Sequence, residues 1–182
     1  MAMQAQQKLV NVISSLENYL STGFGSADVQ WPDVPFSFDE VSSWYAISYL
    51  DIVEETNFQN GDATTGAPGT DWVLLLQISC FARDKVATTG VPVNRRQAHT
   101  MADVVNGLLP LNKEINIYDY ASLGPSDNPA SLPVVDTMYV NLTKTDFFGG
   151  PATATTATPM LEGVRCDVVT VELRWSSTRN AA

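Results

Sequence analysis

The chain has 182 residues, 45% of them hydrophobic and 16% charged, which is enough apolar material for one folded core. Acidic residues outnumber basic residues by 20 to 10, and the net charge of −10 disfavours a protein that binds nucleic acid through a basic face. Two cysteines are too few for a disulfide scaffold, the longest apolar run (residues 72–76) is too short for a membrane span, and the first residues lack the pattern of a secretory signal.

The first predicted element is an amphipathic helix over residues 5–20. Its apolar residues recur three and four positions apart and define one face: Leu9, Val12, Ile13, Leu16, Tyr19 and Leu20. Gly23 and Gly25 follow, and we expect both to lie where the helix ends.

Residues 28–40 are predicted to form an extended connector. Pro32 and Pro35 lie within four residues of each other and disfavour both a helix and a strand ladder. The aromatic side chains of Trp31 and Phe36 are therefore expected on an irregular segment, where they can pack in the core or contact a partner.

Five strands are predicted, at residues 44–53, 72–82, 113–120, 134–143 and 161–175. The second is apolar in both phases of the two-residue alternation, which predicts a central strand covered by helices on one face and by another layer, such as a neighbouring subunit, on the other. In the last strand the apolar residues change phase at Val168 and Val169, which suggests a β-bulge or a bend.

A second helix is predicted for residues 93–108, after Pro92 and before Pro110. The order of helix, two strands, helix and three strands favours an α+β fold in a single domain, residues 1–182. We expect a mostly antiparallel sheet of about five strands with both helices on one face. Cys80 and Cys166 lie in apolar runs and are interpreted as reduced core residues, although a bridge is conceivable if their strands are neighbours.

Three loops, residues 59–70, 123–133 and 149–159, are rich in small and turn-forming residues. Loops of this length are usually functional or disordered. Two interpretations remain open for them: they contact partners and become ordered on assembly, or they are solvated hairpin tips.

The residues of common catalytic and metal sites do not occur in the required patterns. His99 is the one histidine and is interpreted as a surface residue of the second helix, so neither a zinc set of histidines and cysteines nor a serine triad is expected. No phosphate-binding loop is present. The acidic groups around Asp33 and Asp51 are interpreted as solvated edges. We therefore predict a protein that is not an enzyme, with no catalytic residue, metal or cofactor.

The segment Trp31-Pro32-Asp33-Val34-Pro35-Phe36 resembles the connector after the first helix of phage tail-terminator proteins. The resemblance implies a virion protein, assembled in the host cytoplasm, that forms a homomeric sixfold ring. Such a ring caps the tail tube and joins it to the head, with the tail-tube protein and a head-completion or stopper protein as partners.

The expected interface residues are Trp31, Pro32, Pro35 and Phe36, together with Phe147 and Phe148 beside a glycine-rich loop.

An acidic chain also suits a channel through which DNA passes without binding, since negative walls repel phosphates. Other structural functions stay open, namely a different head-to-tail connector component or the tail-tube subunit. A further alternative is a small α+β hydrolase or carbohydrate-binding module that uses Trp31 and nearby carboxylates.

Overall fold

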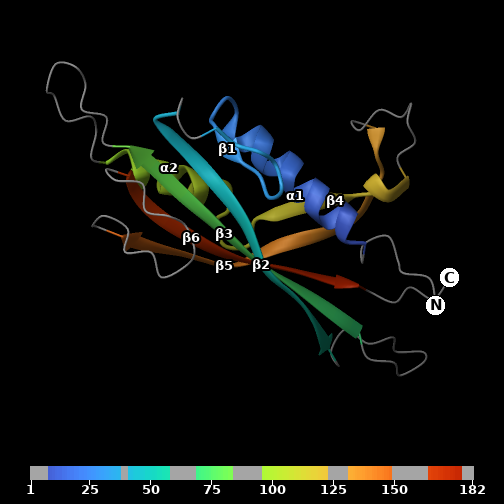
Figure 1. Cartoon of the computed structure of the whole chain (residues 1–182). Coiled ribbons are helices and arrows are strands. Elements are labelled where there is room, and N and C mark those ends of the chain that lie inside the picture. The colour runs from blue at the N-terminus through green and yellow to red at the C-terminus, as the bar shows by residue number, and fades with distance from the viewer. Residues whose placement is uncertain are drawn as a thin grey trace, which may run out of the picture.

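The computed structural model describes residues 8–37, 41–57, 69–83, 96–122, 131–148 and 164–177. Within these residues, two α-helices pack on a curled six-stranded sheet, so the predicted α+β class is confirmed (Figure 1). The strands are β1 (Val29–Gln30), β2 (Ser43–Asn57), β3 (Gly69–Arg83), β4 (Glu114–Tyr118), β5 (Val134–Phe148) and β6 (Val164–Ser177). The helices are α1 (Leu9–Phe24) and α2 (Gln97–Leu108).

The strand order is β1-β2-β3-β6-β5-β4, with β1 parallel to β2 and the other neighbouring pairs antiparallel. The expected five strands were one too few, because β1 is formed inside the predicted connector. A strand of two residues is too short to show any alternation in the sequence. The central position predicted for the second long strand is confirmed, since β3 lies between β2 and β6.

Both helices lie on the same face of the sheet, which we call the helix face. From α1, Val12, Leu16 and Leu20 are fully buried there, each stabilising the fold by roughly 1.5–3 kcal/mol. The sheet contributes a continuous apolar layer: Tyr45, Ile47, Leu74, Leu76, Ile78, Cys80, Ile115, Ile117, Met138, Val140, Val169, Val171, Leu173 and Trp175. None of the described helices is long and apolar enough to cross a membrane.

Helix α1 runs further than expected, to Phe24, and the expectation that Gly23 ends it was wrong. Gly25, with φ of +61°, does end the helix. Gly23 lies inside it because α2 passes close by: a Cβ atom at this position would lie 2.6 Å from Cδ2 of Leu108. The predicted first residues of both helices, 5–7 and 93–95, lie outside the described residues.

The opposite face of the sheet, which we call the reverse face, has an aromatic cluster at one end. The rings of Trp44 and Phe81 stack with centroids 4.9 Å apart, and the Arg83 guanidinium lies 5.8 Å from the centre of the Trp44 ring. Val164 and Cys166 are buried on the same face. No helix among the described elements covers the reverse face.

The β-bulge predicted near Val168 is not present. Strand β6 pairs with β3 in one unbroken register over its whole length. Its apolar residues change phase because its beginning packs on the reverse face while its later residues face the helices. The register shifts lie elsewhere, at Leu50 of β2 and at Asn141 of β5, and a third lies between β4 and β5.

Candidate protein-interaction surface

The connector after β1 begins with a tight turn. The Val34 N–H donates a hydrogen bond to the Trp31 carbonyl oxygen at 3.3 Å, with Pro32 and Asp33 between them. Asp33 has a φ of +59°, so the arrangement is that of a type II turn, with proline second and a left-handed residue third. This turn fixes the direction in which the connector leaves the sheet.

An open groove of about 540 Å³ runs between the connector and the exposed side of α1. Trp31, Pro32 and Val34 form one wall, and Tyr120, in the 3₁₀ helix η2 (Tyr120–Ser122), also lines the groove. The α1 wall is polar: Ser14, Glu17, Asn18 and Ser21. The groove therefore combines an aromatic and apolar wall with a wall of hydroxyl, amide and carboxylate groups.

Glu17 of the groove is tied to the sheet. The Tyr49 hydroxyl donates a hydrogen bond to its Oε1 at 3.1 Å. Burial first, and the nearby Glu17 carboxylate second, raise the pKa of Tyr49 far above its ordinary value. Tyr49 thus stays protonated and holds the Glu17 carboxylate in place.

The four expected interface residues of the connector fall into three separate places. Trp31 and Pro32 are half-buried beside α1, whereas Phe36 lies against Trp44 on the reverse face, with ring centroids 6.3 Å apart. Pro35, between them, is exposed. The connector thus passes around the β1 edge from one face of the sheet to the other, and its two aromatic side chains do not form one surface.

Phe147 and Phe148 lie at the end of β5, with β6 and β3 between them and β2. Their backbones pair with Asp167 and Cys166 of β6, and their side chains lie outside the described part of the structure. The connector and this aromatic pair therefore belong to different halves of the sheet, the connector to the β1–β2 half and the pair to the β5–β4 half.

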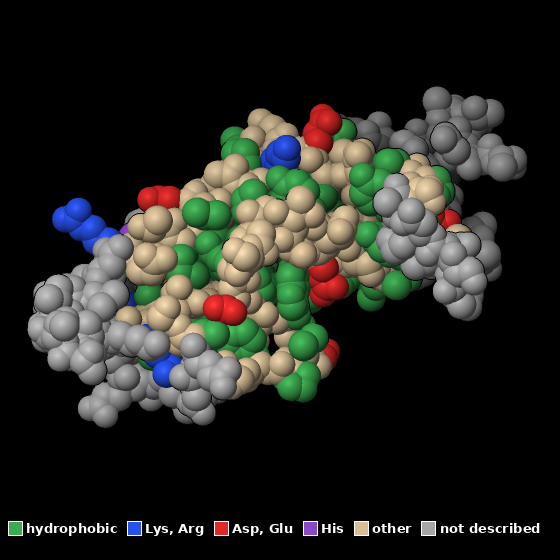
Figure 2. All heavy atoms as spheres, turned by 90° about the horizontal axis from the view of Figure 1, so that it is seen from above, with side chains coloured by type: hydrophobic (Ala, Val, Ile, Leu, Met, Phe, Trp, Pro, Cys, Tyr) green, Lys and Arg blue, Asp and Glu red, His purple; other side chains and the backbone are tan. Residues whose placement is uncertain are grey.

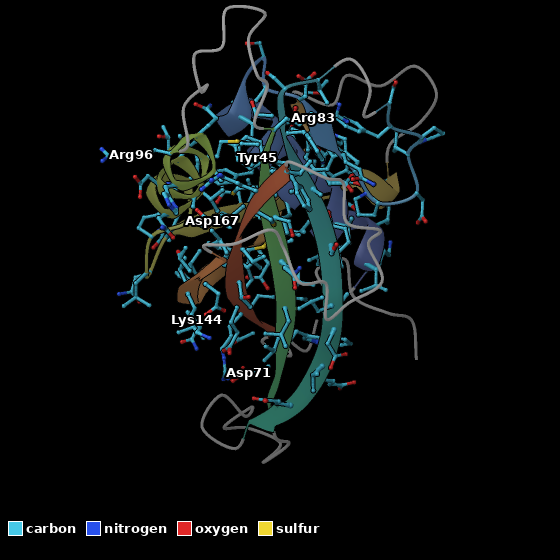
Figure 3. All side chains as sticks on the ribbon, turned by 60° about the vertical axis from the view of Figure 1, so that its left-hand side comes forward. Tyr45, Asp71, Arg83, Arg96, Lys144 and Asp167 are labelled. Carbon is cyan, nitrogen blue, oxygen red and sulfur yellow. The ribbon has the colours of Figure 1, made fainter. Side chains whose placement is uncertain are left out.

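A buried acid on the helix face was not anticipated. Asp167 of β6 is 1% exposed, and its carboxylate contacts Nδ1 of His99 on α2. Figure 3 shows Asp167 on the side of the sheet where α2 lies. His99 was expected at the surface, and its side chain is 47% exposed. Its Nδ1 atom, however, is held by the buried carboxylate of Asp167. The sequence holds a signal for the burial of Asp167, because this residue is in phase with the apolar Val169 and Val171.

The two cysteines are free and buried, as predicted. Cys80 pairs with Asp167 across the β3–β6 ladder and Cys166 pairs with Phe81, so the two thiols belong to opposite faces of the sheet. The two cysteines are therefore free although their strands, β3 and β6, are neighbours. Burial raises the pKa of both thiols, that of Cys166 to about 12.

In the described part of the chain, no three histidine, cysteine or acidic side chains lie close enough together to hold a metal ion. The face seen in Figure 2 shows charged side chains dispersed among hydrophobic and polar ones, without a large patch of one sign. Neither models of known protein families nor curated protein sequences match this chain.

Proposed function

We propose that this protein is a tail terminator of a long-tailed bacteriophage: a structural subunit that forms a closed homomeric ring of six copies on the end of the tail tube. The observation that carries this proposal is the connector. Its sequence is the one that resembles tail terminators, and its turn presents Trp31, Pro32 and the 54% exposed Val34 along a groove beside α1. A rigid turn with apolar side chains is well suited to a protein contact.

Two further properties agree with a ring subunit. A ring requires contacts between two different surfaces of each copy, and the molecule has both the groove and a reverse face without a described helix. The net charge of −10 suits a channel wall that DNA passes without binding. The proposed partners are other copies of the chain, the tail-tube protein and a head-completion protein.

The test is the mass of the purified protein by multi-angle light scattering over a range of concentrations, with negative-stain imaging, alone and with tail-tube protein. A discrete ring, alone or on the tube, supports the proposal. Open-ended tubes of this protein would instead make it a tube subunit. A monomer that ignores the tube protein would overturn the ring.

A matched pair of variants links the ring to the connector. Val34→Asp places a charge on the groove wall, and we expect it to weaken assembly at least tenfold. Leu111→Asp makes the same kind of change at a 62% exposed leucine away from the groove, and it should assemble normally. Equal assembly of both variants would remove the connector from the interface.

The groove also favours one function of a different class, a carbohydrate-binding module or hydrolase. Trp31 and Tyr120 offer aromatic faces, and Glu17 a carboxylate, in the same groove. Titration with oligosaccharides, followed by tryptophan fluorescence, tests this function. Saturable binding that is lost in Trp31→Ala and turnover that is lost in Glu17→Gln would replace the tail-terminator proposal.

A further inference from the structure

Most of strand β2 has one open edge. β1 pairs with it at Tyr45 and Ala46 alone, and over residues 47–57 β3 is the one described strand beside it. The Tyr45 N–H points away from β3, since it donates a hydrogen bond to the carbonyl oxygen of Asp28, the residue before β1. By alternation and the register shift at Leu50, the N–H groups of Ile52 and Glu54 point outward too. The Ile52 N–H donates to its neighbour Asp51 at 2.8 Å, which agrees with this direction.

Strand β5 has an open edge on the other side of the sheet. β4 pairs with residues 134–139 of β5, and Asn112 and Lys113 bond to Val140. Over residues 141–148 the one described strand beside β5 is β6. The two open edges lie toward opposite ends of the sheet, since β2 opens toward the Asp71 end of β3 and β5 toward the Arg83 end (Figure 3).

The side chains of the two edges are complementary. The open part of β2 carries Asp51, Glu54 and Glu55 with no lysine or arginine, beside the exposed apolar Leu50 and Val53. Glu55 contacts Arg174 of β6 at 3.5 Å, and Glu54 lies on the helix face, opposite Trp72 in the ladder. The open part of β5 carries Leu142, 47% exposed, and Lys144, 64% exposed, whose amine is 2.9 Å from Asp146. The ladder registers place Leu142 and Lys144 on the same face as Asp51 and Val53, the reverse face.

We infer that the open edge of β2 pairs with the open edge of β5 of a second copy of this chain. Two β2 edges brought together would place acidic side chains against acidic side chains, with no lysine or arginine on either open segment, which disfavours a twofold dimer through β2. A β5 edge brings Leu142 and, paired with Asp146, Lys144 to the reverse face, so it can cover Val53 and place a lysine near Asp51. The acids of β2 thus select the partner as well as guard the edge.

The strand directions fit a repeating assembly. β5 runs antiparallel to β6, β6 to β3, and β3 to β2, so β5 and β2 run in opposite directions. A second copy in the same orientation therefore adds its β5 antiparallel to β2, and the alternation continues across the boundary. Each copy still offers one free edge of each kind, as a ring requires. Because the open segments lie at opposite ends, the copies must be staggered, as in closed barrels, where tilted strands allow closure.

This interface rests on the proposed homomeric ring, and two edge variants test it. Glu54→Pro removes an outward N–H of β2 without removing a bond to β3. The pair Leu142→Asp and Lys144→Glu turns the β5 edge acidic. Leu9→Asp, at a 49% exposed leucine in the first turn of α1, is the matched control and should assemble as the unaltered chain does. Circular dichroism checks that every variant is folded.

Light scattering on the variants, alone and mixed, gives the decisive result. Each edge variant alone should remain monomeric, whereas an equimolar mixture should form dimers of twice the monomer mass and nothing larger, since one good edge of each kind is left. Rings formed by either edge variant would overturn the pairing and leave the ring itself in place. Filaments of the unaltered chain that both variants abolish would support the pairing and overturn the tail-terminator function. A monomeric unaltered chain, with and without tube protein, would overturn both.

Discussion

Asp167 is a charged residue buried among the apolar side chains of β6. A carboxylate that is 1% exposed among apolar side chains is costly unless it is paired. His99 contacts it from α2, so this contact ties the helix to β6. A buried group of this kind contributes most to stability through the penalty for losing its partner.

Removal of His99 should therefore destabilise the protein more than its half-exposed position suggests. We expect His99→Ala to lower the free energy of unfolding by about 2–3 kcal/mol, measured by urea denaturation. Asp103→Ala, at an exposed acid on the same helix, should change it by less than about 0.5 kcal/mol. Equal effects of the two variants would show that the contact with Asp167 adds no stability.

The buried thiols should make stability depend on pH on the alkaline side. Burial raises the pKa of Cys166 from 9.0 to about 12, so in this interval the unfolded chain loses a proton that the folded chain keeps. Stability is then full below pH 9 and falls as the pH rises toward 12. Cys166→Ala should reduce the slope by up to about 1.4 kcal/mol per pH unit. Part of the slope should remain, because burial also raises the pKa of Tyr45 to about 12.

Urea denaturation at a series of alkaline pH values measures these slopes. A uniform loss of stability in Cys166→Ala, with the same slope as the unaltered chain, would assign the pH dependence to other groups. Thiol reagents give an independent check. Both thiols should react slowly in the native state and fully in denaturant.

At the scale of elements, the crossing of α1 and α2 depends on Gly23. The space that a Cβ would need is taken by the side chain of Leu108, with Cδ2 at 2.6 Å and Cδ1 at 2.8 Å. The same crossing is held by the Tyr19 hydroxyl, which donates to the Leu108 carbonyl oxygen at 2.7 Å. Gly23 is therefore retained inside a helix, although glycine is a poor helix former.

A double-mutant cycle tests this crossing. Alanine favours a helix over glycine by about 1 kcal/mol, but in Gly23→Ala the clash with Leu108 should cancel this gain and lower stability by about 1 kcal/mol. In a Leu108→Ala background the same change should raise stability. A coupling of about 1–2 kcal/mol in urea denaturation is expected. A sum of independent effects would show that Leu108 simply moves aside.

The elements that could be predicted from the sequence are those with a strong local period. Apolar residues three and four positions apart identified the two helices. Runs of β-branched and other apolar residues identified five of the six strands, and both kinds of element were predicted with errors at their ends. Gly23 was misjudged because the residue that requires it, Leu108, is distant in the sequence. From the sequence alone, the phase change of β6 suggests a β-bulge or a bend. No bulge is present, and the apolar cluster on the reverse face that accounts for the phase change cannot be seen in one strand alone.

The candidate site was less predictable than the fold. Trp31 and Phe36 are close in sequence, but the type II turn at Asp33 sends them to opposite faces. The contact of Asp167 with His99 joins β6 to α2, and local periodicity carries no information on such a pairing. The complementary open edges follow from the strand order, which a sequence pattern does not specify.

At the scale of the whole molecule, the net charge of −10 sets the behaviour toward nucleic acids. Proteins that bind duplex DNA through phosphates lose affinity steeply as salt rises, because they release condensed counterions. An acidic channel wall does not release them.

We therefore expect no measurable binding to duplex DNA between roughly 50 and 200 mM salt, the range over which phosphate contacts show most clearly. Fluorescence anisotropy with a labelled duplex measures it, on the monomer and on any ring. Salt-sensitive binding in the low-salt samples would contradict the proposed channel. A basic DNA-binding protein under the same conditions is the positive control.

The alternation of β6 has one more consequence, for the changes that the chain can tolerate. Val164 and Cys166 are buried on one face of this strand, and Val169, Val171 and Leu173 on the other. Inserting one residue between the two groups would turn one of them to the wrong face. A surface turn can absorb such a change in length. In β6 the same change would place Asp167 among the aromatic side chains of the reverse face or bring Trp175 into solvent. In a library of single-residue insertions, the middle of β6 should be among the positions where no folded protein is recovered.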